Sequence, residues 1–228
     1  METAVDTREA LLDAAESLFA EHGIPASSLR AITQQAGANL AAVHYHFGSK
    51  EGLVRAVFAR RLAPMSEERL RLLEACDLDR PDALEQVLRA FLAPLVHKMR
   101  NRAEGLQSFA RLMGRAYSEP SGEVRAIVAE QVEESFHRFV AAFHRLLPHL
   151  TERELLWRMH FMGGSMGHTV ACGDLLERFS RGLCRVTDAD EALAHLVVFL
   201  AAGLRAPALP VSGAVPPGSA VSAAVQGD

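Results

Sequence analysis

Three adjacent ring-bearing residues, His44, Tyr45 and His46, are the side chains whose types and spacing best suit contact with another molecule. They lie in the stretch QQAGANLAAVHYHFGSKEGL, residues 34–53. Each ring carries a polar atom that can donate or accept a hydrogen bond. Because a buried helix gains little from three polar-tipped rings in a row, we expect them to touch a partner outside the domain.

A helix that begins after Asn39 would separate these rings from its apolar residues. Leu40, Val43 and Phe47 follow one another at spacings of three and four, so they share one face, which we predict to be buried. The outer arc then carries Ala41, Ala42, His44, Tyr45 and Gly48. Small residues beside a few long side chains suit a helix that enters the major groove of DNA, which is about 12 Å wide.

Two further helices are predicted before this one. Capping residues and glycines favour a first helix from Asp6 to Gly23 and a second from Ser27 or Ser28 to Gly37. The tight turn that follows gives the second and third helices the spacing of a helix-turn-helix motif. A fourth helix begins near Lys50, where the ammonium group and free backbone N–H groups can hold a phosphate.

The candidate DNA-binding residues take different roles. We assign groove and backbone contact to His44 and Tyr45, and phosphate contact to Ser28, Lys50 and the backbone of Ala42. His46 lies near the inner edge of the helix, where packing inside the domain is at least as consistent with its position. The predicted site is therefore Ser28, Asn39, Ala42, His44, Tyr45 and Lys50.

The charge of this region is not that of a general DNA binder. From Met1 to Arg60 there are five basic and seven acidic residues, a formal charge of −2, and the whole chain of 228 residues carries −4. Each neutralised phosphate contributes about −0.9 to the salt dependence of binding. We therefore expect this region, the DNA-binding head, to bind DNA with modest affinity on its own, so that tight binding needs two heads acting together.

Over residues 6–58 the sequence resembles the TetR/AcrR family of transcriptional regulators. The residues that match the family pattern are Arg30, Ile32, Ala36, Gly37, Phe47, Ser49, Lys50 and Leu53. His44 stands where tyrosine is usual, Ala42 where threonine or serine often touches phosphate, and Leu40 replaces a polar residue. The resemblance implies a helix-turn-helix head followed by a helical domain that binds a ligand and dimerises.

The rest of the chain is also helical in pattern, so the predicted fold is all-α. We expect helices at roughly 50–75, 82–101, 104–117, 121–147, 152–180 and 188–205. Pro94 lies inside a helical pattern and predicts a kink or a split. The predicted organisation is a DNA-binding domain over 1–50, a ligand-binding and dimerisation domain over 51–205, and a disordered, proline-containing tail over 206–228.

The segment from Leu155 to Gly173 is apolar almost all round, with Arg158 as its one formal charge. Such a helix must be covered on two sides. We predict that one side packs on the domain's own core and that the other, together with the helix over 192–204, forms a four-helix interface in a homodimer.

Aromatic and methionine residues suggest a pocket for a small apolar ligand. The stretches SFARLMGRAYS and LLWRMHFMGGSMGHT look like the fatty-acid-responsive, PsrA-like branch of the family, which implies an acyl effector that weakens DNA binding. Arg111 and His160 are candidate partners for its headgroup. The predicted pocket residues are Leu95, Met99, Phe109, Arg111, Met113, Phe139, Phe143, Trp157, His160 and Phe161. For any one of them, ordinary core packing is the favoured alternative.

Other functional classes have weaker support. The stretch GGSMG around Ser165 matches the nucleophile-elbow pattern of serine hydrolases, but that elbow requires a strand before it. His168 and Cys172 lie four residues apart, yet zinc needs three or four ligands. Three cysteines and the absence of an apolar leader in the first residues favour a reduced, cytoplasmic protein with no membrane span.

Together these patterns predict a homodimeric DNA-binding regulator, most simply a repressor, rather than an enzyme, with no metal and no cofactor. Two recognition helices about 34–36 Å apart, or a multiple of that distance, would bind a nearly palindromic operator. An apolar effector would release the DNA. A regulator controlled by a protein partner instead of a small molecule is the alternative left open.

Overall fold

The computed structural model describes residues 6–98, 109, 112–114, 122–186 and 188–209. Every regular element among them is an α-helix, which confirms the all-α fold. The helices are α1 (Thr7–His22), α2 (Leu29–Gln35), α3 (Leu40–Phe47), α4 (Lys50–Glu74), α5 (Ala83–Lys98), α7 (Glu123–Leu146), α8 (Glu152–Ala171), α9 (Gly173–Phe179) and α10 (Ala189–Arg205). Within these ranges, no helix has both the length and the apolar composition needed to cross a bilayer.

The head formed by α1, α2 and α3 is defined by side chains that cap its helices. Ser28 Oγ accepts a hydrogen bond from the Ala31 N–H at 3.1 Å, and Asn39 Oδ1 accepts one from the Ala42 N–H at 2.9 Å. Gly37, in the turn between α2 and α3, has a φ of +63°, which favours glycine. The predicted starts of these helices are confirmed.

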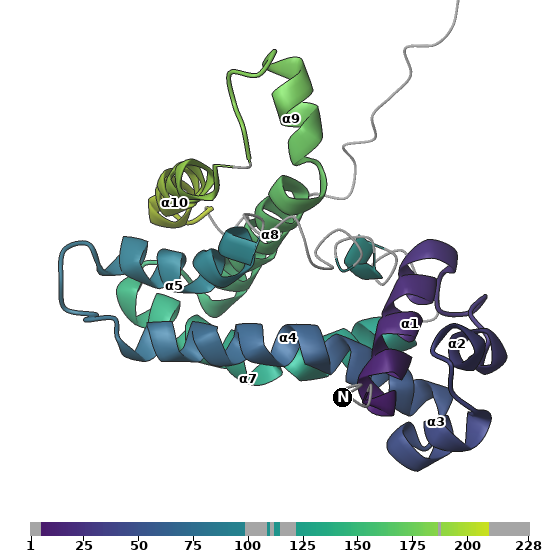
Figure 1. Cartoon of the computed structure of the whole chain (residues 1–228). Coiled ribbons are helices and arrows are strands. Elements are labelled where there is room, and N and C mark those ends of the chain that lie inside the picture. Colours follow the sequence, from purple (N-terminus) through teal and green to yellow (C-terminus); the bar gives the residue numbers. More distant parts are fainter. Residues whose placement is uncertain (1–5, 99–108, 110–111, 115–121, 187, 210–228) are drawn as a thin grey trace, which may run out of the picture.

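Helix α4 belongs to the head and to the rest of the molecule at once. The apolar cluster of the head includes Phe19, Ile32 and Val43, continues along α4 as far as Met65, and takes in Val124 of α7. Farther along, α4 packs against α5 and α7 (Figure 1). The predicted domain boundary at residue 50 therefore lies at the start of a helix whose side chains serve both parts.

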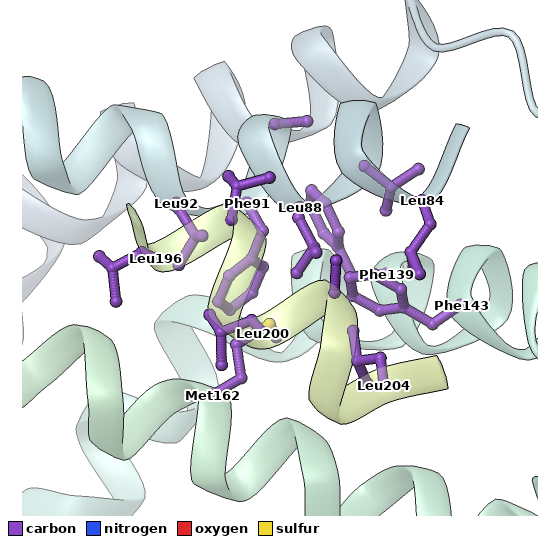
Figure 2. Packing of buried hydrophobic residues seen from close by; sticks show 14 of the residues in the cluster. Leu84, Leu88, Phe91, Leu92, Phe139, Phe143, Met162, Leu196, Leu200 and Leu204 are labelled. Atoms are coloured by element: carbon purple, nitrogen blue, oxygen red, sulfur yellow. The ribbon is translucent and has the colours of Figure 1, made fainter. Parts of the chain in front are cut away.

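A second apolar cluster fills the space between α5, α7, α8 and α10. Phe139 and Phe143 of α7 are fully buried there, and the Phe91 ring meets the Phe139 ring edge-on with centroids 5.1 Å apart. Figure 2 shows the Phe91 ring beside Met162 of α8 and Leu200 of α10. This cluster fixes the four helices in the body of the molecule.

Two helices differ from the prediction. The single helix expected over 152–180 is divided at Cys172, where φ is −124° and ψ is 21°. Pro94 does not split its helix, because α5 is helical from Ala83 through Lys98. Pro64 also lies inside a helix, α4, and the sequence prediction did not consider its effect.

The start of the predicted disordered tail is bound to the body. Arg158 donates hydrogen bonds to the carbonyl oxygens of Ala206 at 2.7 Å and Pro207 at 2.8 Å, and also to those of Gly203 and Leu204. These contacts correct the prediction for the first residues after α10. Residues 210–228 lie outside the described part of the chain.

Gly52, in the first turn of α4, lies against the backbone at the end of α3. A Cβ placed there would be 2.0 Å from the Phe47 carbonyl oxygen and 3.2 Å from its carbonyl carbon. Backbone atoms at a helix end cannot move aside as a flexible side chain can. Glycine is therefore what allows α3 to sit close to α4.

We expect Gly52→Ala to lower the free energy of unfolding by about 1–3 kcal/mol, the usual cost of overpacking. Gly163→Ala in α8 is the matched control, because a Cβ there meets nothing within 4 Å. Alanine should stabilise that helix by up to about 1 kcal/mol. Urea unfolding at one protein concentration measures both changes, and equal stability of the two variants would contradict the close approach.

Candidate nucleic-acid interface

Helix α3 presents one buried and one exposed face. Val43 is fully buried and Phe47 partly so, as predicted, whereas Tyr45 is 85% exposed and His44 is also exposed. The prediction for Leu40 is wrong, because its side chain is 49% exposed. Ala42, Val43 and Phe47 are the residues of α3 that belong to or pack against the apolar cluster of the head, and Leu40 at the start of the helix is not among them.

The three adjacent rings do not share one environment. The His46 ring is only partly exposed and meets the Tyr45 ring edge-on, with centroids 4.9 Å apart. His44 Nδ1 lies 3.0 Å from the Gly48 carbonyl oxygen. Because a carbonyl oxygen only accepts, Nδ1 carries the proton, and Nε2 of the neutral ring is left as a hydrogen-bond acceptor. Tyr45 and His44 therefore offer polar atoms on the exposed face, and His46 supports Tyr45 from the side.

Lys50 lies where the starts of α2 and α4 come near each other. Its ammonium group is 3.5 Å from the carbonyl oxygen of Pro25, in the loop that leads to Ser28. Burial lowers the pKa of Lys50. Among the described residues, the ammonium group has no acidic partner within 4.0 Å that would oppose this effect. Ser49 Oγ caps α4 by accepting from the Gly52 N–H at 3.1 Å. The cation is thus placed beside two helix N-termini, an arrangement that favours anions.

Most other cations of the head are occupied by carboxylates. Arg8 pairs with Glu9 at 2.9 Å, Arg55 pairs with Glu51 and Glu130, and Arg60 pairs with Asp13 and Glu16. Arg30 on α2 is exposed, and in the described ranges it has no such partner. Arg30 is not among the site residues predicted from the sequence, because the sequence alone does not show which arginines are paired.

A shallow hollow lies beside the exposed rings, between the start of α1 and the N-terminal half of α3. Its lining residues are Thr7, Gly37, Ala38, Asn39, Ala41, Ala42, Tyr45 and His46. It brings together three residues of the predicted site, Asn39, Ala42 and Tyr45. Thr7 joins them from α1, and the periodicity of the sequence contained no signal for it.

The residues predicted to line one ligand pocket lie in separate places. Leu95, Phe109 and Met113 belong to the cluster of the head, whereas Phe139 and Phe143 belong to the second cluster. Trp157, His160 and Phe161 lie on the exposed face of α8 and belong to neither cluster. The reason is that Leu155, Met159 and Met162 take the inner face of that helix. Met99 and Arg111 lie outside the described residues.

The weaker functional signals do not form sites. Ser165 lies in the middle of α8, where its carbonyl oxygen accepts a hydrogen bond from Thr169 Oγ1 at 2.9 Å, so the GGSMG stretch is helix and not a strand-to-helix elbow. His168 and Cys172 lie one turn apart at the end of that helix. Searching the described residues finds no group of three side chains suited to a metal ion.

Comparison with known proteins relates both parts of the chain to one family. Residues 11–57 match the family "Bacterial regulatory proteins, tetR family", and residues 89–203 match the family "Tetracyclin repressor-like, C-terminal domain". The repressor BepR of Brucella suis is 34% identical over 92 residues, 40% of this chain and 43% of that protein. The regulator SrpR of Pseudomonas putida is 28% identical over 153 residues, 67% of this chain and 65% of that protein. The chain spans less than half the length of the first curated relatives it matches.

Solved structures have the same fold. The regulator PfmR of Thermus thermophilus superposes with a TM-score of 0.58 at 19% identity, covering 86% of this chain and 96% of that one. The fatty acid degradation regulator FadR of Bacillus halodurans gives 0.59 at 14% identity, covering 90% and 99%. At such identities the likeness concerns the fold alone, and the fatty-acid-responsive branch is not singled out. With a helix-turn-helix head and a helical C-terminal domain that each match its models, this chain belongs to the TetR family of bacterial transcriptional regulators.

Proposed function

We propose that this protein is a cytoplasmic transcriptional repressor that binds a nearly palindromic DNA operator as a homodimer. Each subunit inserts α3 into the major groove, with Tyr45 and His44 at base edges and the sugar–phosphate backbone. Ser28, Asn39 and Ala42 position the helix against phosphates, and Arg30 and Lys50 neutralise them. The observation that carries this proposal is the exposed Tyr45 ring on the capped, two-turn helix α3. Arg30 on the helix before it and Lys50 on the helix after it have no carboxylate partners among the described residues.

The exposed faces of α8 and α10 support the homodimer. The exposed face of α8 carries Trp157 and Phe161, whose stacked rings have centroids 5.8 Å apart. The exposed face of α10 carries Val198 and Phe199. A second copy of the same face would cover these side chains in an isologous four-helix interface. Recognition helices related by such a two-fold axis would meet successive major grooves about 34–36 Å apart, or a multiple of it.

Contacts between α4 and α7 support control by an effector in the C-terminal domain. Ser66 Oγ donates to the Gln131 carbonyl oxygen at 3.2 Å, and Arg55 bonds Glu130. A molecule that changes how α7 packs would therefore move α4 and, with it, the head. We propose an apolar effector, a fatty acid or an acyl thioester, on the resemblance of the sequence to acyl-responsive members of the family.

Tyr45→Ala should weaken operator binding by about 1–3 kcal/mol for each of the two half-sites, the usual value of a good base contact, while leaving the fold intact. Tyr45 makes no interior packing that alanine would remove, so the free energy of unfolding should change by less than about 0.5 kcal/mol. His149→Ala, an exposed ring after α7, serves as the control. Fluorescence anisotropy with an operator selected by the purified protein measures the change, and undiminished affinity would show that α3 is wrongly assigned.

Arg30→Ala and Lys50→Ala should each flatten the salt dependence of operator binding by about 1.8 in log–log slope, because each removes one phosphate contact from each of the two subunits. Arg71→Ala should leave the slope unchanged, since Arg71 is paired with Glu68 at 2.7 Å in the distal part of α4. The slope is obtained from affinities at several salt concentrations. Equal slopes for all three variants would exclude Arg30 and Lys50 from the interface.

Long-chain fatty acids and their thioesters should lower operator affinity by about 5–150-fold, the usual range of coupling between two sites. The same operator must then lower the affinity for the effector by the same factor, because coupling is reciprocal. Calorimetric titration of the acyl compound with and without operator measures that factor. An acyl compound that binds equally well in both titrations is not the effector, and release only by a second protein would support the alternative regulator.

A further inference from the structure

The chain between α8 and α10 forms a projection with apolar side chains on its outside. After α8 ends, α9 stands away from the helical body, and the chain returns towards α10 through Val186 (Figure 1). Phe179 is 79% exposed and Leu183 is 86% exposed, and Leu175 and Leu176 are also exposed. We call residues 173–186 the arm.

The two ends of the arm are held together at the body. A Cβ on Gly173 would lie 2.0 Å from Cγ2 of Val186, so Val186 packs directly against the backbone of Gly173 and a larger residue would overlap it. Val186 is buried and belongs to the apolar cluster of the C-terminal domain. The contact fixes where the chain leaves the body and where it returns, and only the residues between these points project.

The end of α9 is closed by a defined turn. The Gly182 N–H donates to the Glu177 carbonyl oxygen at 2.8 Å and the Arg181 N–H donates to that of Arg178 at 3.2 Å, which is the Schellman pattern. Arg181 has a φ of 55°, in the left-handed region that a non-glycine residue rarely adopts. The turn keeps Phe179 and Leu183 on the outside of the arm.

The arm follows directly after α8, whose exposed face the proposed homodimer would cover. His168 on that face lies little more than one turn before Gly173. The exposed parts of the three aromatic side chains Trp157, Phe161 and Phe199 would together bury about 300–400 Å², since a whole aromatic side chain buries about 150–250 Å². A stable interface takes about 800 Å² of polar and apolar surface from each partner, and about two-thirds of a homodimer interface is apolar. The apolar side chains of the arm can add to this apolar area.

We propose that the arm of each subunit clasps the second subunit of the homodimer and buries Phe179 and Leu183 against it, beside the α8–α10 interface. The partner is a second copy of this chain, and two-fold symmetry gives both arms the same contact. This inference rests on the proposed homodimer. It adds a surface that the four-helix interface does not include.

Sedimentation equilibrium of the full chain over a dilution series tests the arm. Changing both Phe179→Ser and Leu183→Ser should raise the dissociation constant of the dimer at least about tenfold, because truncated aromatic and apolar anchors dominate binding energies. The fold should be unaffected, since neither side chain is buried in one subunit. Leu209→Ser, which is 74% exposed but outside the arm, should leave the constant unchanged.

A third variant separates failure of the arm from failure of the homodimer. Phe161→Glu places a charge on the exposed face of α8 and should yield monomers. If it does so while the double arm variant dimerises as tightly as the unaltered chain, the arm proposal is overturned and the homodimer stands. If the unaltered chain is monomeric throughout the dilution series, both proposals fall.

Discussion

The carboxylate of Glu16 joins the head to the rest of the molecule. Its side chain on α1 is almost fully buried and accepts hydrogen bonds from Arg60 at 2.6 Å and from Arg61 at 2.8 Å, both on α4. Burial alone would lower the pKa of Arg60, but hydrogen bonds from its guanidinium to Glu16 and Asp13 raise it. Removing either partner would leave a buried charge unpaired, which typically costs about 3–5 kcal/mol. The head is therefore held against α4 and is not joined to it by a flexible linker.

A head fixed to α4 must follow that helix when it moves. With 25 residues, α4 is about 37 Å long at 1.5 Å per residue. A tilt of about 5° at its distal end then displaces its N-terminal end by about 3 Å, close to the spacing of 3.4 Å between stacked base pairs. In the proposed homodimer both heads would shift in opposite directions, so a small change in packing at α7 would suffice to spoil the fit to two half-sites. The constraint at Glu16 is what would make such a signal reach α3.

The sequence contained the local information and lacked the long-range information. The starts of α2, α3 and α4 were predictable because Ser28, Asn39 and Ser49 cap them within three residues. Three features depend on contacts between distant segments, and periodicity carries no signal for them. The exposure of Leu40 depends on which residues the cluster of the head includes, and the break at Cys172 depends on the return of Val186 to Gly173. That Arg30 has no carboxylate partner among the described residues depends on which carboxylates are already bound by other arginines. Periodicity likewise placed Trp157 and Phe161 on one side of α8 but could not say whether that side faced a pocket or solvent.

The distribution of charge in the head matters more for DNA than its sum of −2. Asp13 and Glu16 are bound by arginines on the side of α1 that faces α4, so much of the negative charge is neutralised there. Among the residues that the structure describes, Arg30 and Lys50 have no such partners near the N-termini of α2 and α4, whose dipoles add to their attraction for phosphate. Two cations in one head still neutralise few phosphates, so a single head would bind weakly at physiological salt. Tight binding then requires that two heads be held at a fixed separation, because the second head binds at the high effective concentration that the first creates. In the proposed homodimer, the stiffness of the joint at Glu16 and the strength of the dimer interface would therefore determine operator affinity together.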